Sequence, residues 1–299
     1  MRKLFVVFLI VGGFFALERL CHKATDGFAL NRIAYPLDVE VVESNKPLSV
    51  EHQFALNILR TEKFYYLGSG AQVYAFCTKD NQYVLKLFKF HHMRIPPIVS
   101  KLPLTKGLEK LRKEKIDFKT NIIKDVFNSF TIAYNHLKEE TALLLVHLNR
   151  TNHLNGSVHI VDRINNEYNL DLDNTYFVLQ HYATLAYDQI DTWMEQKEIT
   201  KARNGIRSLV KLAAKRCQKG IMDKDPDFST NFGFINGKAR QIDIGRFAHN
   251  INECKPDIYG PEMIRITRPF RNWLEAHHEA LVEVLDEEVE RISGPQAGI

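Results

Sequence analysis

Carboxylates and amides are concentrated in one stretch of the chain, GIMDKDPDFSTNFGFINGKARQIDIGRF, residues 220–247. Asn231 begins the first of two short apolar runs, and Asp243 ends the second, directly before Ile244-Gly245. An amide oxygen and a carboxylate at the two ends of a hairpin are hard ligands that bind Mg²⁺ together with phosphate oxygens. The residues therefore predict a metal pair formed by Asn231 and Asp243.

Asp225 lies upstream of this pair and is a candidate catalytic carboxylate. A carboxylate that accepts a hydroxyl proton, or orients a nucleophile toward phosphorus, depends on its position more than on an unusual pKa. Asp225 is predicted to have this role, with Asp223 and Asp227 as alternatives.

A second group of candidates lies nearer the N-terminus. Gly68-Ser69-Gly70 separates two strand-like runs, so its backbone N–H groups can approach a polyphosphate without a Cβ in the way. Lys86 follows on an apolar strand, where an unpaired cation is costly to bury. Its expected partners are a nucleotide phosphate and Glu140 on a predicted long helix, with Glu139 as the alternative.

The elements that must position these residues alternate between strands and helices. Residues 61–90 predict three antiparallel strands, and residues 121–148 predict a long amphipathic helix from their apolar spacing of four and seven. Later segments are predicted from the same two periodicities: strands at 157–164 and 174–183, helices at 186–197 and 201–218, a hairpin at 232–245 with an Asn236-Gly237 type I′ turn, and a helical tail at 266–292.

In order and spacing, these residues resemble the protein-kinase-like superfamily, which includes protein kinases and aminoglycoside-type phosphotransferases. The resemblance covers residues 61–250. In that family a glycine loop covers the ATP phosphates, a strand lysine pairs with phosphates and a helix glutamate, and a catalytic aspartate precedes a metal-binding asparagine and aspartate. The resemblance implies ATP and Mg²⁺ as cofactors. It also implies an α+β, two-lobed fold, with a small antiparallel-sheet N-lobe containing one long helix and a mostly helical C-lobe.

The resemblance assigns roles residue by residue. The cofactor-binding residues are Gly68, Ser69, Gly70, Lys86, Glu140 and the hinge-like Gln180 and Tyr182; the catalytic residue is Asp225; the metal ligands are Asn231 and Asp243. This sequence departs from the family in three places. The loop lacks the third glycine, six positions rather than five separate Asp225 from Asn231, and no Ala-Pro-Glu follows Gly245.

Composition narrows the class of protein. The 299 residues are 45% hydrophobic and 25% charged, which is typical of a globular domain. A net charge of +4 on 40 basic and 36 acidic residues argues against nucleic acid as a partner. Four cysteines without a C-x-x-C pair argue against a zinc site. Two His-His pairs, at 91–92 and 277–278, are assigned no metal role, and Trp193 and Trp273 are predicted to be core residues.

The N-terminus predicts a targeting segment. Two cations precede an apolar run that extends from Leu4 to Leu17, as in a secretory signal or a short membrane anchor. The predicted division is a signal or anchor at 1–20, an extension at 21–60, an N-lobe at 61–182 with a basic surface insertion at 91–120, and a helical C-lobe at 183–299. A membrane-anchored or exported protein is therefore expected, and a cytoplasmic body is the alternative.

The expected function is Mg²⁺-ATP-dependent transfer of the γ-phosphate to a hydroxyl acceptor, either protein or small molecule. The alternative is a pseudokinase that binds nucleotide or a partner as a scaffold. Membrane association through the N-terminal apolar segment is compatible with either function. Retention of Lys86, Asn231 and Asp243 favours the enzyme.

Overall fold

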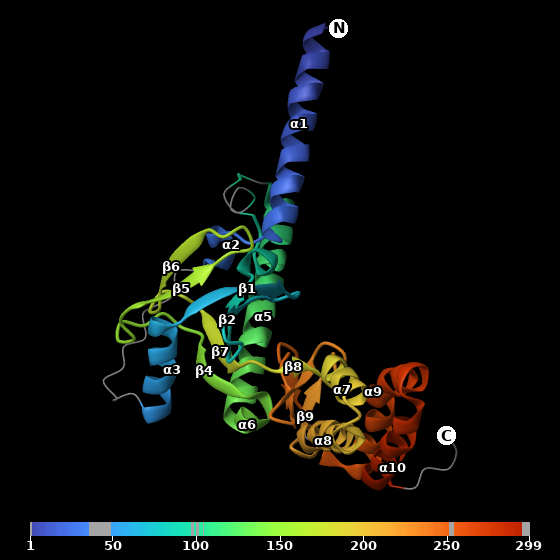
Figure 1. The fold of residues 1–299 in the computed structure, drawn as a ribbon. Helices are drawn as coiled ribbons and strands as arrows, with labels where there is room; N and C mark the ends of the chain where they lie inside the picture. The colour runs from blue at the N-terminus through green and yellow to red at the C-terminus, as the bar shows by residue number, and fades with distance from the viewer. Residues whose placement is uncertain are drawn as a thin grey trace. The chain divides into compact units, whose positions relative to one another are not determined.

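The computed structural model describes residues 2–35, 49–96, 99, 102–103, 105–250 and 254–294. The protein is an α+β protein with a mostly antiparallel sheet toward the N-terminus and a helical C-terminal region, as the sequence predicts (Figure 1). The chain divides into two compact units. The first comprises residues 1–123 and 147–179, and the second comprises residues 124–146 and 180–299.

The sheet of the first unit has the strand order β4-β7-β3-β2-β1-β5-β6. The three strands predicted at 61–90 are confirmed, whereas β4 and β6 were not predicted. The strands are β1 (Lys63–Ser69), β2 (Val73–Thr78), β3 (Tyr83–Phe88), β4 (Leu143–His147), β5 (Ser157–Val161), β6 (Glu167–Asp171) and β7 (Phe177–His181). Neighbours β1, β2 and β3 pair antiparallel, while β5 runs parallel to β1.

Apolar side chains on alternate positions of these strands form the core of the first unit. Phe64, Phe76, Leu85 and Leu87 have no exposed surface. Helix α3 (Val50–Thr61) covers β5, and its first turn is capped by Ser49, whose hydroxyl accepts from the His52 backbone N–H at 3.2 Å. This packing fixes the strands that present the glycine loop.

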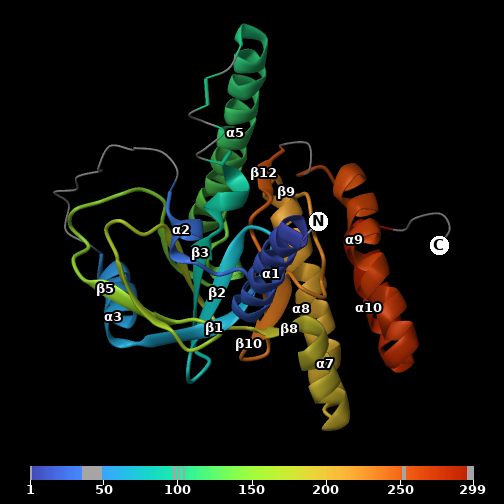
Figure 2. The same cartoon turned by 90° about the horizontal axis from the view of Figure 1, so that it is seen from above.

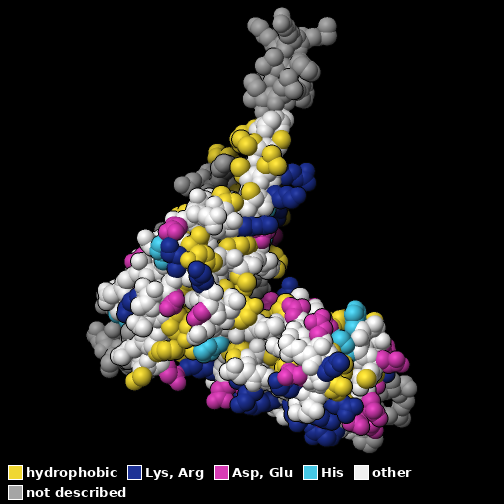
Figure 3. Space-filling view, viewed as in Figure 1, with side chains coloured by type: hydrophobic (Ala, Val, Ile, Leu, Met, Phe, Trp, Pro, Cys, Tyr) yellow, Lys and Arg dark blue, Asp and Glu magenta, His cyan; other side chains and the backbone are white. Residues whose placement is uncertain are grey.

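The N-terminal segment forms helix α1 (Arg2–Thr25), followed by the short α2 (Leu30–Ile33). Large apolar side chains on its described part are exposed to solvent: Phe14, Phe15, Leu17 and Leu20 (Figure 3). In the part of the chain that the structure describes, none of the helices combines the length and apolar character needed to cross a bilayer. The signal or anchor at 1–20 stays a prediction.

The long helix occupies a different position from the predicted one. Helix α5 runs Lys106–His136, so it begins well before residue 121 and includes the second half of the segment predicted as a surface insertion (Figure 1). The apolar spacing continued past the helix end because the next strand, β4, is also apolar. Between them lie the four-residue helix α6 (Lys138–Thr141) and Ala142 in a left-handed conformation (φ 53°). Pro97, part of the predicted break, lies outside the described residues.

Beyond the part of α5 that belongs to it, the second unit is built from further helices and small sheets (Figure 2). Its helices are α7 (Ala186–Glu195), α8 (Ile199–Gln218), α9 (Pro256–His277) and α10 (Val282–Ser293), and its strands are β8 (Thr184–Leu185), β9 (Ile221–Asp223), β10 (Phe232–Ile235), β11 (Lys238–Gln241) and β12 (Phe247–His249). The predicted hairpin is confirmed as β10–β11, with positive φ at Asn236 (49°) and Gly237 (75°).

The core of the second unit lies between its helices and the β10–β11 hairpin. Trp193 and Phe234 meet edge to face at 4.9 Å, and Gly205 of α8 lies so close that an added Cβ would be 2.5 Å from Trp193. Trp193 is a core residue, as predicted, whereas Trp273 is only partly buried. The hairpin that holds the candidate site therefore rests on a rigid helical base.

Candidate functional site

Asn231 and Asp243 lie side by side at the ends of the β10–β11 hairpin. The Asn231 carbonyl accepts hydrogen bonds from the backbone N–H groups of Ile242 (2.7 Å) and Asp243 (3.3 Å). The Asp243 side chain is exposed, and its Oδ1 accepts from the Gly245 N–H at 3.3 Å. The structure thus brings together the two residues that the sequence predicts as metal ligands.

A buried serine of α5 fixes the turn after Asp243. Ser129 has no exposed surface; its hydroxyl donates to the Ile244 carbonyl and accepts from the Phe247 N–H at 2.6 Å. Both Ser129 and the turn belong to the second unit. Sequence reasoning missed Ser129, because a single serine on an apolar helix stripe gives no signal of the distant turn that it contacts.

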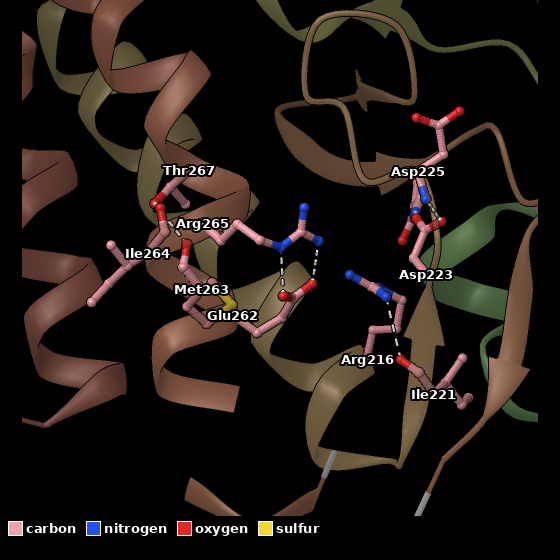
Figure 4. Close-up of polar contacts among 10 residues, drawn as sticks. Arg216, Ile221, Asp223, Asp225, Glu262, Met263, Ile264, Arg265 and Thr267 are labelled. Carbon is pink, nitrogen blue, oxygen red and sulfur yellow. Dashed lines mark hydrogen bonds and ion pairs between the residues drawn. The ribbon is translucent and has the colours of Figure 1, made fainter. Parts of the chain in front are cut away.

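Asp223 is a buried carboxylate that organises the loop before Asn231. Its side chain accepts hydrogen bonds from the Asp225 N–H at 3.0 Å and from the Gln241 side-chain amide at 2.5 Å. Burial raises the pKa of the Asp223 carboxyl, while the nearby Arg216 guanidinium opposes that shift. Arg216 is itself buried and donates to the Ile221 carbonyl at 3.3 Å (Figure 4).

Asp227 is occupied by its own turn. Its Oδ1 accepts from both the backbone N–H and the hydroxyl of Ser229 at 2.8 Å, and its Oδ2 accepts from Thr230 at 3.3 Å. The Asp227 carbonyl also accepts from the Asn231 N–H at 2.9 Å. This turn accommodates the additional residue between Asp225 and Asn231.

Asp225 is the most open of the three aspartates. Its carboxylate points away from Asp223 (Figure 4), and it has an ion pair with Arg246 at 3.7 Å in which both side chains are at least half exposed. The Asn231 side-chain amide donates to the Asp225 carbonyl. One asparagine therefore joins the loop of Asp225 to the strand end of Asp243.

The donor set at this hairpin fits a hard divalent cation. The Asn231 side-chain nitrogen donates a hydrogen bond to the Asp225 carbonyl, which identifies the other amide atom as oxygen. This Oδ1 accepts one hydrogen bond, from Thr230 at 3.0 Å, and its second lone pair can bind a metal ion. Mg²⁺ binds proteins through one or two such oxygens and takes its other ligands from water and phosphates. Accordingly, the described residues hold no cluster of three or more His, Cys, Asp or Glu side chains suited to a metal.

The glycine loop belongs to the first unit and follows a bulge in β1 between Tyr66 and Gly68. A Cβ added at Gly68 or at Gly70 would meet no atom within 4 Å, so neighbouring protein atoms do not require either glycine. Lys89, a buried lysine that sequence reasoning missed, donates to the Gly70 carbonyl at 2.6 Å and lies 4.4 Å from the Tyr74 ring centre. Lys86 is half-buried on β3, opposite Ala75 of β2.

Glu140 does not occupy the predicted place. It lies in α6 rather than on the long helix, and it belongs to the second unit. Its carboxylate pairs with Lys215 and lies 3.6 Å from the Lys219 ammonium, both at the end of α8. Burial would raise the pKa of Glu140, but the two lysines lower it below the usual value. The placement of Glu140 on the long helix was wrong, because the helix ends at His136.

The hinge-like residues lie at the end of β7. Gln180 is buried, and its side-chain amide donates to the Thr141 carbonyl. The His181 N–H donates to the Ala142 carbonyl at 3.0 Å, and Tyr182 is half-buried. The Gln180 side chain therefore has a structural role, which leaves only its backbone for a nucleotide.

All four cysteines are free thiols. Cys77 and Cys217 are buried, whereas Cys21 is exposed and Cys254 is half-buried. Burial raises the pKa of the Cys77 thiol to about 11, so it remains protonated at neutral pH. The cysteines contribute no chemistry to the site.

Comparison with known proteins gives structural matches only. No family and no curated sequence matches the chain. Among solved structures, the bifunctional kinase-methyltransferase WbdD is 14% identical with a TM-score of 0.35, over 76% of this chain and 43% of WbdD. A complex of Rv3197 with erythromycin from Mycobacterium tuberculosis is 11% identical with a TM-score of 0.34, over 81% of this chain and 60% of Rv3197.

The chain spans less than two thirds of either protein. Because the TM-scores are only 0.35 and 0.34, these structures do not assign roles to single residues. The candidate roles rest on the geometry of this chain.

Proposed function

We propose that the protein is a Mg²⁺-ATP-dependent phosphotransferase with a kinase-like, two-lobed fold, which transfers the γ-phosphate to a hydroxyl acceptor. The observation that carries this proposal is the position of Asn231, whose amide binds the Asp225 carbonyl and whose carbonyl accepts from the Asp243 N–H. One residue thereby links the backbone of the candidate base to the backbone of the candidate metal ligand, and phosphoryl transfer depends on such relative positioning.

Asp225 is the proposed base because Asp223 and Asp227 are engaged in holding the loop. The acceptor oxygen forms a bond to the γ-phosphorus, the bond from that phosphorus to the β–γ bridging oxygen breaks, and ADP leaves. The hydroxyl proton passes to an Asp225 carboxylate oxygen. When bound, Mg²⁺ neutralises charge on the phosphate oxygens. In this proposal, Asn231 and Asp243 hold that ion.

The first unit supplies the phosphate-binding groups in this proposal. Lys86 pairs with phosphate oxygens, and the N–H groups of the glycine loop approach them over the open space at Gly68 and Gly70. These contacts position the nucleotide and offset its charge, which accounts for most of the catalysis expected in phosphoryl transfer.

The test is turnover of γ-labelled ATP by the full chain with Mg²⁺, measured as label in protein, small molecules and free phosphate. Asp225→Asn and Asp243→Asn should each lower turnover by about 10²-fold or more. Glu287→Gln, on the exposed face of α10, is the matched control and should retain full turnover. Turnover that persists in both site variants contradicts the proposal. Mg²⁺-dependent ATP binding without turnover would favour the pseudokinase.

A further inference from the structure

A cavity of about 420 Å³ lies beside Asp225 within the second unit. Its walls come from the loop between β9 and β10, from α7 and from α9. The residues that the argument uses are Lys224, Asp225, Tyr187, Pro269 and Trp273. This volume is in the range of small-ligand pockets. Its lining combines charged side chains with aromatic and aliphatic ones.

One wall of this cavity is an ordered aromatic stack. The rings of Tyr187 and Trp273 are 4.1 Å apart and inclined by 23°, and Tyr187 also stacks on Phe270 at 5.4 Å. Phe270 is fully buried and contacts Phe228 edge to face at 5.5 Å. The core therefore fixes these two partly buried rings, so a ligand ring can pack on their accessible parts with little loss of side-chain entropy.

The polar groups of the cavity are arranged around this wall. Burial raises the pKa of Tyr187 to about 12, and the Asp227 carboxylate contributes, so the phenol keeps its proton at neutral pH. Lys224 is exposed and forms no ion pair with any residue that the structure describes. Arg265 is held by Glu262 through bonds of 2.6 and 2.7 Å. Lys224 is thus the cation that a ligand anion can neutralise.

The surroundings of the cavity favour a small molecule over a protein segment. Only residues 246–255 separate the turn after Asp243 from the start of α9. So short a connection offers little chain on which a peptide substrate could dock. Helix α9 itself closes one side of the cavity through Ile266 and Pro269. A cavity of this size with an aromatic wall fits a compact ring-bearing ligand better than an extended chain.

We propose that this cavity binds the acceptor, a sugar acid or similar ring-bearing hydroxyl compound with an anionic group. Its apolar ring face packs on Tyr187 and Trp273, its anionic group pairs with Lys224, and a ring hydroxyl faces Asp225. This assignment rests on the proposed function, because Asp225 acts there as the base. The acceptor class and the residues that select the acceptor are additions to the proposed function.

Trp273 provides a direct readout of binding. The chain has two tryptophans, and Trp193 is 6% exposed in the core, so Trp193→Phe leaves Trp273 as the fluorescent reporter. The full-length Trp193→Phe chain is titrated with D-glucuronate, with D-glucose and with the peptide acetyl-Ala-Ser-Ala-amide. Saturable quenching by glucuronate, about tenfold tighter than by glucose, is expected from one charge-assisted contact.

Lys224→Gln should remove the preference for glucuronate, and Lys238→Gln, an exposed lysine at the hairpin turn, should leave it intact. Equal affinities for glucose and glucuronate, a preference for the peptide, or no saturable quenching by any probe would each overturn the proposal. ATP turnover is measured on the same preparations. Turnover without sugar binding rejects only the acceptor site, whereas sugar binding without turnover rejects the phosphotransferase.

Discussion

The Asp26 carboxylate accepts a hydrogen bond of 2.5 Å from the Tyr66 phenol, and the same oxygen accepts from the Ser69 hydroxyl at 2.9 Å. Burial, together with the Asp26 bond, raises the pKa of Tyr66 to about 12, and the Tyr66 bond lowers the pKa of Asp26. The segment after α1 thus ties down the strand that leads into the glycine loop. No local pattern in the sequence associates Asp26 with residues so far along the chain.

Asp26→Asn should lower the free energy of unfolding by about 1 kcal/mol, because a charge-assisted acceptor becomes a neutral one. Asparagine is chosen because residue 26 has φ 49°, which asparagine tolerates better than alanine. Since the pKa of Asp26 is lowered in the folded state, the difference is fully present at neutral pH and shrinks as pH falls below about 4. Urea unfolding at pH 7 and pH 3.5 measures it. Equal stabilities at pH 7 would contradict this role.

Gly68→Ala and Gly70→Ala should separate a structural from a ligand-binding role of the loop. Open space surrounds both Cβ positions and neither residue has positive φ, so the free energy of unfolding should change by less than about 0.5 kcal/mol. The Kd for Mg²⁺-ATP should rise severalfold, because a methyl group would obstruct the approach of phosphates. Gly233→Ala is the contrasting control, since its Cβ would lie 2.5 Å from the Thr184 carbonyl oxygen and should destabilise the second unit. Unchanged ATP affinity in both loop variants would remove the loop from the site.

The sequence predicts the hairpin well because every signal for it is local. Asn236-Gly237 defines the turn, apolar runs define the strands, and the turn fixes the register that places Asn231 next to Asp243. The adjacency of Asn231 and Asp243 followed from this local geometry alone. The same holds for the β1–β3 meander, whose strands are apolar and are separated by short polar turns.

Non-local contacts account for what the sequence did not predict. Periodicity placed Glu140 on a helix that in fact ends at His136, because the apolar strand β4 continued the apparent stripe. Asp223 is buried and accepts from Gln241 of another strand, whereas Asp225 is exposed, and both environments depend on segments distant from this loop. Trp273 was expected in the core, yet its ring lines the cavity, a distinction that depends on how α9 packs beside α7. Side-chain spacing within one segment contains none of this information.

Glu140→Gln tests the corrected role of that residue. Its carboxylate pairs with lysines that are largely exposed, so the loss in the free energy of unfolding should be about 1 kcal/mol. ATP turnover should stay within twofold of the wild type, because the carboxylate is already engaged at the end of α8. Lys215→Gln should reproduce the stability change. A loss of turnover of tenfold or more in Glu140→Gln, with normal stability, would instead support the family's helix-glutamate role.

His91 should make the first unit lose stability in mild acid. Burial, helped by the neighbouring charges of His92 and Arg32, lowers the pKa of His91 to about 4, well below the usual value of about 6.5. Between these pH values the unfolded chain binds a proton that the folded chain does not, so stability falls as pH drops from about 6.5 to 4. His91→Phe should reduce this loss by about 1 kcal/mol between pH 7 and pH 5, with solvent screening limiting the effect. Thermal unfolding across that pH range measures the loss of stability. His249→Gln, which changes an exposed histidine of the second unit, is the control. Identical pH profiles for wild type and His91→Phe would show that His91 is not the residue responsible.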